Sequence, residues 1–187
     1  AVQIITVQDF RPPVFTSVPN HVTIQCDDPV PFVGNPTATD NCSGYVQITF
    51  LGQSNTGGDC PQEYVLTRTW LAQDECGNSV TATQTITVQD NAAPAFVNPP
   101  ANVTVYCPDI PSAPVVTAQD NCGTATVNYL GQNQSPGDCG SGYTITRTWT
   151  ADDGCGNTAT HTQLITVLPG FSPGPDDRIG ESGEHPD

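Results

Sequence analysis

Eight cysteines are the residues whose type and spacing bear most directly on the chemistry of this chain. Within each half of the chain, successive cysteines are 15 to 18 residues apart, and no C-x-x-C pair occurs. Structural zinc sites use closely spaced cysteine or histidine pairs, so this spacing disfavours zinc. We therefore expect disulfide bonds, which form in oxidising compartments and imply secretion or display on the cell surface.

Carboxylate and amide side chains form a second group, whose oxygen atoms suit a calcium ion. Asp90 ends one predicted strand, and the other members lie in two turns expected at the same junction: Asp120, Asn121, Asp152 and Asp153. An equivalent set is expected at the first junction: Asp9, Asp40, Asn41 and Asp74, with Glu75 nearby. The alternative is that these residues cap turns by binding local N–H groups. Calcium is the one cofactor that the sequence suggests, and both interpretations stay open.

A tandem repeat positions these residues. Tyr64–Asn78 (YVLTRTWLAQDECGN) returns 79 residues later as Tyr143–Asn157 (YTITRTWTADDGCGN), which is the mark of a duplicated module. We predict one repeat over residues 10–90 and a second over 91–169. Ala1–Asp9 matches the end of repeat one, so we expect it to be the closing strand of an earlier repeat, or a donor strand. Residues 170–187 are expected to form an acidic, Gly/Pro-rich tail or linker.

Apolar residues within each repeat recur with period two, in short runs rich in Thr and Val that Gly, Pro, Asn and Asp separate. Nothing resembles a helix of ten or more residues. This pattern predicts an all-β fold of two tandem Ig-like antiparallel β-sandwich repeats, stapled by disulfides.

Strand directions choose among the three ways of pairing four cysteines in each repeat. The opening strand is expected to run down to Cys26, and the strand after it to run up to Cys42. Strand 64–72 also runs up, which places Cys60 at the bottom and Cys76 at the top. The predicted disulfides are Cys26–Cys60, Cys42–Cys76, Cys107–Cys139 and Cys122–Cys155. Each closes a loop of roughly 35 residues, which corresponds to roughly 3–4 kcal/mol of stability.

Charge limits the partners. The chain has no lysine, four arginines and a net charge of −15, so it is unsuited to bind nucleic acid or an anionic membrane. It also contains no run of about 18 apolar residues that could insert into a bilayer.

Trp70 and Trp149 each follow an arginine on the same strand face. We interpret them as core residues, with an aromatic platform for sugars as the alternative. Catalysis has little support, because His21, His161 and His185 are scattered and no nucleophile or phosphate-binding motif occurs. We predict that the chain is not an enzyme.

Two segments carry a resemblance to a known family: ATDNCSG (38–44) and TRTWLAQDECGNSVTATQTITVQDNAAPAF (67–96). They resemble the HYR-like repeats of very large bacterial cell-surface proteins, among them the gliding-motility adhesins of the type IX secretion system. The resemblance covers nearly everything from Ala1 to Val167. It implies an Ig-like sandwich in a long cell-surface array used for adhesion.

These observations together predict a structural or adhesive repeat module of an extracellular protein, acting as a stiff, disulfide-locked stalk or fibre segment. One alternative is a filament subunit that assembles by β-strand addition. Another is a carbohydrate-binding accessory module. The expected partners are neighbouring repeats or subunits of the same protein, with surface glycans or other cells as further candidates.

Overall fold

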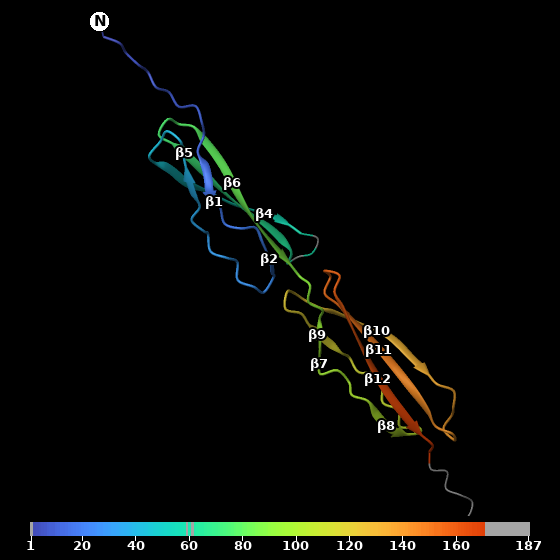
Figure 1. Cartoon of the computed structure of the whole chain (residues 1–187). Coiled ribbons are helices and arrows are strands. Elements are labelled where there is room, and N and C mark those ends of the chain that lie inside the picture. The colour runs from blue at the N-terminus through green and yellow to red at the C-terminus, as the bar shows by residue number, and fades with distance from the viewer. Residues whose placement is uncertain (1, 59, 61, 171–187) are drawn as a thin grey trace, which may run out of the picture. The chain divides into compact units, whose positions relative to one another are not determined.

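The computed structural model describes residues 2–58, 60 and 62–170 of the 187-residue chain (Figure 1). The chain forms two compact units. The first comprises Ala1–Pro94 together with two turn segments, Gln119–Ala125 and Asp152–Asn157. The second comprises Ala95–Ala118, Thr126–Ala151 and the chain from Thr158 onward. The predicted tail, residues 170–187, lies outside the described residues except for Gly170.

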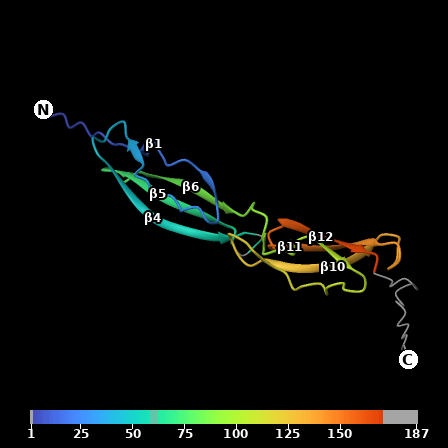
Figure 2. The same ribbon diagram turned by 90° about the horizontal axis from the view of Figure 1, so that it is seen from below.

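Two β-sheets make up the first unit (Figures 1 and 2). The larger sheet has the order β2-β6-β5-β4, and the smaller pairs β1 with β3. The strand bounds are β1 Val14–Ser17, β2 Val22–Gln25, β3 Thr37–Thr39, β4 Val46–Gly57, β5 Tyr64–Asp74 and β6 Ser79–Gln89. β4, β5 and β6 pair antiparallel, whereas β2 joins the edge of β6 in parallel.

The second unit repeats this topology, with the sheet β10-β11-β12-β8 and the pair β7-β9. Its strands are β7 Ala95–Val97, β8 Val103–Tyr106, β9 Thr117–Gln119, β10 Thr126–Gln134, β11 Tyr143–Asp152 and β12 Thr158–Leu168. β8 joins β12 in parallel, as β2 joins β6 in the first unit. The predicted all-β, Ig-like sandwich repeats are confirmed. The parallel edge strand is a departure from the strictly antiparallel sheets that the sequence analysis expects.

The central strands follow directly from the sequence pattern. Along β5, alternate side chains from Leu66 to Asp74 are buried, because successive residues of a strand point to opposite faces of the sheet. The apolar core beneath them is small. One cluster of it in the first unit consists of Leu66, Ile86 and Val88 with partly buried neighbours, and Trp70 and Ala72 are buried as well. A small core in a small unit makes covalent links important for stability.

The two tryptophans belong to the interior. Trp70 is 2% exposed and Trp149 is 1% exposed. The Trp70 ring lies 5.6 Å from that of Phe50. A sugar-binding platform needs an exposed ring face, so the sugar-platform alternative is wrong for these residues and the core interpretation is confirmed.

Arg68 is also buried, with 3% of its surface exposed. Its guanidinium donates to the carbonyl oxygens of Pro31 and Phe32, at 2.7 and 3.2 Å, and to Oε1 of Gln84 at 3.2 Å. Neutral oxygens rather than a carboxylate satisfy this charge. The arginine thereby holds the loop before β3 against the larger sheet.

No helix in the described part of the chain is long and apolar enough to cross a membrane.

Candidate functional site

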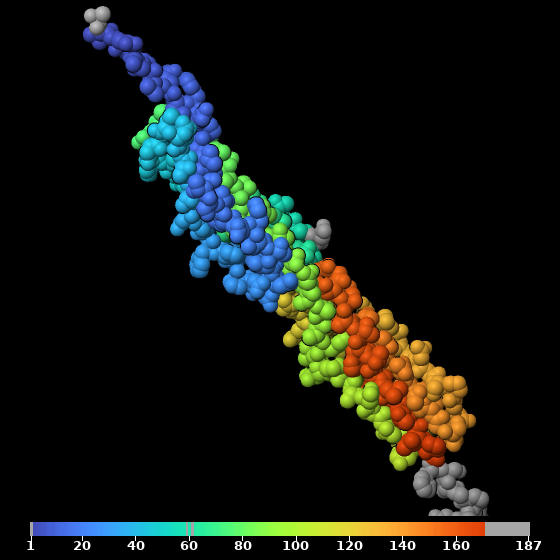
Figure 3. All heavy atoms as spheres, in the orientation of Figure 1, coloured from blue at the N-terminus to red at the C-terminus, as the bar shows by residue number. Residues whose placement is uncertain are grey.

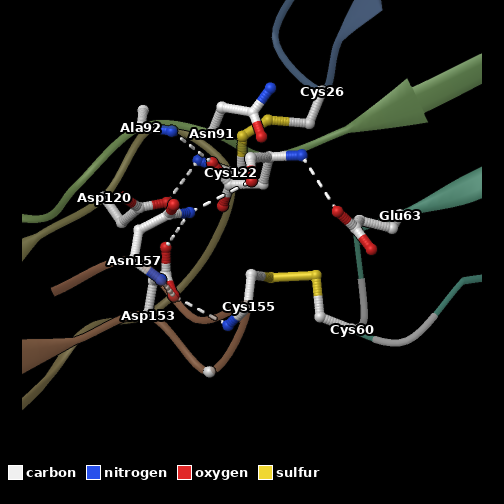
Figure 4. The surroundings of a disulfide bond; sticks show 12 residues. Cys26, Cys60, Glu63, Asn91, Ala92, Asp120, Cys122, Asp153, Cys155 and Asn157 are labelled. Carbon is white, nitrogen blue, oxygen red and sulfur yellow. Dashed lines mark hydrogen bonds between the residues drawn. A yellow bond between two sulfur atoms is a disulfide. The ribbon is translucent and has the colours of Figure 1, made fainter.

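The strongest candidate site is a cluster in the first unit where two disulfides meet a set of acidic residues (Figure 4). Cys26 is bonded to Cys122, with Cα atoms 5.6 Å apart. Cys60 is bonded to Cys155, with Cα atoms 5.1 Å apart. We call these four cysteines, together with the acidic residues Glu63, Asp90, Asp120 and Asp153, the disulfide cluster. Each bond joins residues of repeat one to a turn whose sequence belongs to repeat two.

These pairings correct the predicted Cys26–Cys60 and Cys122–Cys155 bonds. Strand directions correctly bring Cys26 and Cys60 to one end of repeat one. The prediction assumed that each repeat closes on itself. The turns around Cys122 and Cys155 instead join the first unit, so each sulfur at this end has a candidate partner in the other repeat as well as its own.

The remaining four cysteines fall into two groups. Cys107 and Cys139 are bonded to each other, which is the pair that the sequence analysis predicts. Cys42 and Cys76 are exposed and unpaired within the described residues, so the predicted Cys42–Cys76 bond is absent from the structure. Strand order places Cys42 and Cys76 at the same end of the repeat, but it could not show whether they bond to each other or stay free.

Asn157 connects the turn after β11 to the end of β6. Its Nδ2 donates to the Asp90 carbonyl oxygen at 3.0 Å and to Oδ2 of Asp153 at 2.7 Å. Oδ1 of Asp153 accepts from the backbone N–H of Cys155 and of Asn157, at 2.7 and 3.1 Å. These bonds lower the pKa of Asp153, although burial acts in the opposite direction. The turn is therefore fixed by a charged carboxylate as well as by its disulfide.

Asp90 is 3% exposed and sits at the centre of the cluster. Burial raises the pKa of this carboxyl group, and the charges of Asp120, Asp153 and Glu63 raise it further. Its Oδ1 accepts from the backbone N–H of Ala92 at 3.0 Å. Asp120 uses Oδ1 to accept from the N–H of Cys122 at 2.8 Å, while its buried Oδ2 has no hydrogen-bond partner. The cluster thus concentrates negative charge that hydrogen bonds only partly satisfy.

The structure brings together only part of the predicted metal set. Ligand atoms of Asp90, Asp120 and Cys122 lie within 4.8 Å of one another, although the sulfur of Cys122 is already used in its disulfide. Asp153 borders the same cavity of about 150 Å³ as Asp90. The other two predicted ligands lie apart: exposed Asp152 caps its own turn through the N–H of Gly154, and exposed Asn121 points its amide at Cys26 Sγ.

The same arrangement occurs at the other end of the first unit. Oxygen atoms of Asp9, Asp40 and Asp74 lie within 4.8 Å of one another. Nδ2 of Asn78 donates to the Asp9 carbonyl oxygen at 3.1 Å and to Oδ2 of Asp74 at 2.8 Å. Asp9 and Asp40 each have a buried Oδ2 without a partner. This end therefore reproduces the disulfide cluster without its disulfides.

Sequence reasoning missed the role of Asn78 and Asn157, although a signal was available. Each is the last residue of a repeated C-G-N motif. The glycine before each adopts a left-handed backbone, with φ of 92° at Gly77 and 99° at Gly156, a conformation that glycine adopts without strain. Because the two turns have the same shape, the asparagine that follows each glycine makes the same hydrogen bond, to the carbonyl oxygen of Asp9 or of Asp90.

Comparison with known proteins finds that part of the chain is similar to a described family of domains. Residues 95–167 match the model of the HYR-like domain with 4 cysteines. The chain is 31% identical over 173 residues to hyalin of Lytechinus variegatus, covering 86% of this chain and 32% of that protein. It is 31% identical over 175 residues to hyalin of Strongylocentrotus purpuratus, covering 88% of this chain and 14% of that protein. The HYR-like resemblance is thereby confirmed, whereas these relatives give no support to bacterial origin or to the type IX system.

Solved structures with a similar arrangement include ectodomains of cadherins. The protocadherin GammaB4 extracellular domain aligns over 84% of this chain and 34% of its own, with 15% identity and a TM-score of 0.36. Drosophila N-cadherin EC1-4 aligns over 84% of this chain and 49% of its own, with 16% identity and a TM-score of 0.35. Likeness at this level carries no argument about function.

Proposed function

We propose that this chain is a structural and adhesive repeat module of an extracellular protein. One observation carries the proposal: two disulfides join cysteines of repeat one to cysteines of repeat two. Disulfides need an oxidising compartment, and covalent links between successive repeats suit a structural role. The match to an HYR-like domain and the similarity to hyalin support the same role.

The finer part of this proposal is that the disulfides make the chain a stiff segment. The polypeptide between Asp90 and Pro94 and two disulfides give three covalent connections between the repeats. The Asn157 amide adds a non-covalent one. Three connections should restrict bending between the repeats more than a single linker would, because a single linker allows free rotation.

Solution X-ray scattering before and after reduction tests this stiffness. We expect one narrow distribution of interatomic distances for the oxidised chain and a broader one after treatment with a phosphine reductant. Equal distributions would remove the stiff-stalk role. Cys42→Ser/Cys76→Ser is the matched control, because its disulfides are those of the native chain and its scattering should respond to reduction in the same way.

Adhesion itself is tested with beads that carry the chain at one density. If the module binds its own kind, coated beads should aggregate and uncoated beads should not. Aggregation only with beads that carry extracellular glycans would instead support the carbohydrate-binding alternative, which the buried tryptophans disfavour.

A second role rests on the orphaned carboxylate oxygens. We propose that a calcium ion binds between Asp90 and Asp120, because Oδ2 of Asp120 is buried without a partner next to a second buried carboxylate. A divalent cation would relieve this repulsion and take oxygen ligands. Calcium should therefore raise the unfolding temperature of the chain, and Asp120→Asn should reduce that shift while Asp152→Asn leaves it unchanged. An identical melt in calcium and in chelator would exclude the site.

A further inference from the structure

Residues 2–9 have the sequence of an interior strand but no sheet to join in the described structure. They run away from the rest of the first unit as an extended segment (Figures 1 and 3). Their apolar side chains are open to solvent, with Val2 92%, Ile4 86%, Ile5 76% and Val7 85% exposed. Exposure of four large apolar residues in eight positions is costly unless another surface covers them.

The closing strands β6 and β12 carry a matching apolar face, and in each of them that face is buried against the rest of its repeat. When Asp9 is aligned with Asp90, the residues Gln3, Ile5 and Val7 fall on Gln84, Ile86 and Val88 of β6. Those three are 4%, 0% and 2% exposed. The matching residues of β12, Gln163, Ile165 and Val167, are 5%, 0% and 1% exposed. The segment thus carries the buried face of a closing strand, including the glutamine that binds the buried arginine.

The junction after this segment is already formed. Asn78 holds the Asp9 carbonyl oxygen in the way that Asn157 holds that of Asp90, at 3.1 and 3.0 Å. Oδ1 of Asp9 accepts from the N–H two residues later, as Oδ1 of Asp90 does. A strand that ends at Asp9 therefore meets the first repeat as β6 meets the turns of the second repeat.

The cysteines complete the correspondence. Cys42 and Cys76 occupy the repeat positions of Cys122 and Cys155. The latter two are bonded to Cys26 and Cys60, whereas Cys42 and Cys76 are exposed thiols. The turns that carry Cys42 and Cys122 are stabilised in the same way. Oδ1 of Asp40 accepts from the N–H of Cys42, and Oδ1 of Asp120 accepts from the N–H of Cys122, each at 2.8 Å. One end of the first unit therefore presents the thiols that the other end has already joined.

We propose that Cys42 and Cys76 bind, through two disulfides, a β-sandwich repeat that lacks its own closing strand. Ala1–Asp9 supplies that strand, and the partner carries cysteines in the positions of Cys26 and Cys60. Cys42 bonds the first of these and Cys76 the second. This inference rests on the proposed role as an array module and specifies how the array continues.

Each bond forms by oxidation of two thiols, one on each repeat. The two sulfurs join, and the two electrons and two protons pass to a small-molecule disulfide such as oxidised glutathione, which leaves as two thiols. The strand brings the thiols together first, so that the second step is effectively intramolecular.

The test extends the full chain with a partner made from its own sequence. A copy of residues 10–81 is placed directly before Ala1, so that Ala1–Asp9 becomes its closing strand, and Cys42 and Cys76 of the added copy are changed to serine. After oxidation with glutathione we expect the cross-linked peptides Cys26–Cys42 and Cys60–Cys76, and no free thiol. The amide hydrogens of residues 2–8 should exchange slowly in the extended chain and rapidly in the original chain.

Recovery of Cys42–Cys76 together with an additional Cys26–Cys60 peptide would overturn the proposal, as would rapid exchange of residues 2–8 in both chains. The matched control also carries Cys26→Ser and Cys60→Ser in the added copy, and should keep Cys42 and Cys76 as free thiols. If the added repeat fails to fold, thiol counting on the original chain decides instead. Two reactive thiols at Cys42 and Cys76 support the proposal, and a Cys42–Cys76 bond contradicts it. Scattering of the original chain tests the array role separately, because that measurement depends on neither thiol.

Discussion

Removal of the Cys60–Cys155 bond is the perturbation whose effect can be worked out most directly. The bond closes a loop with a sequence separation of 95 residues. A loop of this length restricts the unfolded chain by about 4.7 kcal/mol when it is the only cross-link. With Cys26–Cys122 still in place, the ring that remains to be closed has roughly 70 residues, which lowers the figure to about 4 kcal/mol.

The variant for this test is Cys60→Ser/Cys155→Ser, unfolded with urea while tryptophan fluorescence is followed. Trp70 and Trp149 are buried, so their emission should shift as the core opens. We expect a loss of about 4 kcal/mol in the free energy of unfolding. Cys42→Ser/Cys76→Ser is the matched control, since it also replaces two cysteines but neither of them is bonded in the structure. It should unfold like the native chain.

The reasoning fails if the two double variants lose the same stability. It also fails if Cys60→Ser/Cys155→Ser loses less than about 1 kcal/mol, the scale of one neutral hydrogen bond. The free thiols give an independent reading. They should be Cys42 and Cys76 in this variant, whereas pairing within repeats would instead leave Cys26 and Cys122 free.

Three further predictions concern the hydrogen bonds and charges. Asn157→Ala should lower the free energy of unfolding by about 1–3 kcal/mol in urea unfolding, because it leaves the partly buried Asp153 carboxylate with fewer donors; exposed Asn121→Ala should have almost no effect. Asp90→Asn, measured in chelator, should stabilise the chain at neutral pH and stabilise it less in acid. The pKa of Asp90 is raised in the folded state, so the protonated carboxyl group favours the native state at low pH, and that benefit is lost as the pH rises through the folded-state pKa. Asparagine stays neutral and therefore avoids this loss. A melt difference independent of pH would contradict this. Arg68→Met should lower the unfolding midpoint in calorimetry, since the carbonyl groups of the loop before β3 lose their donor. An unchanged midpoint would show that these hydrogen bonds do not stabilise the loop.

Much of the fold is predictable from the residue pattern, because successive side chains of a strand point to opposite faces of the sheet and so alternate between buried and exposed. The alternation from Leu66 to Ala72 places Trp70 in the core, as the structure has it. The duplication of Tyr64–Asn78 identifies two equivalent repeats before any coordinates are known. The strand directions place Cys26 and Cys60 at one end of their repeat.

Pairing of the cysteines was less accessible, because the order of strands within a repeat says nothing about which repeat supplies the partner sulfur. Four sulfurs meet at the disulfide cluster, and local topology allows both pairings. The hydrogen bond from Asn157 to Asp90 brings the turn of one repeat to the strand end of the other, and it depends on backbone geometry at Gly156 that composition does not reveal. The acidic set behaves similarly: Asp90 and Asp120 lie together, whereas Asp152, a neighbour in sequence, points into its own turn.

Disulfide mapping of the oxidised chain under non-reducing conditions tests the central claim most directly. After proteolysis, mass spectrometry should recover Cys26 linked to Cys122 and Cys60 linked to Cys155, with Cys42 and Cys76 carrying the alkylating label of free thiols. Recovery of Cys26 linked to Cys60 and Cys122 linked to Cys155 would contradict covalent joining of successive repeats.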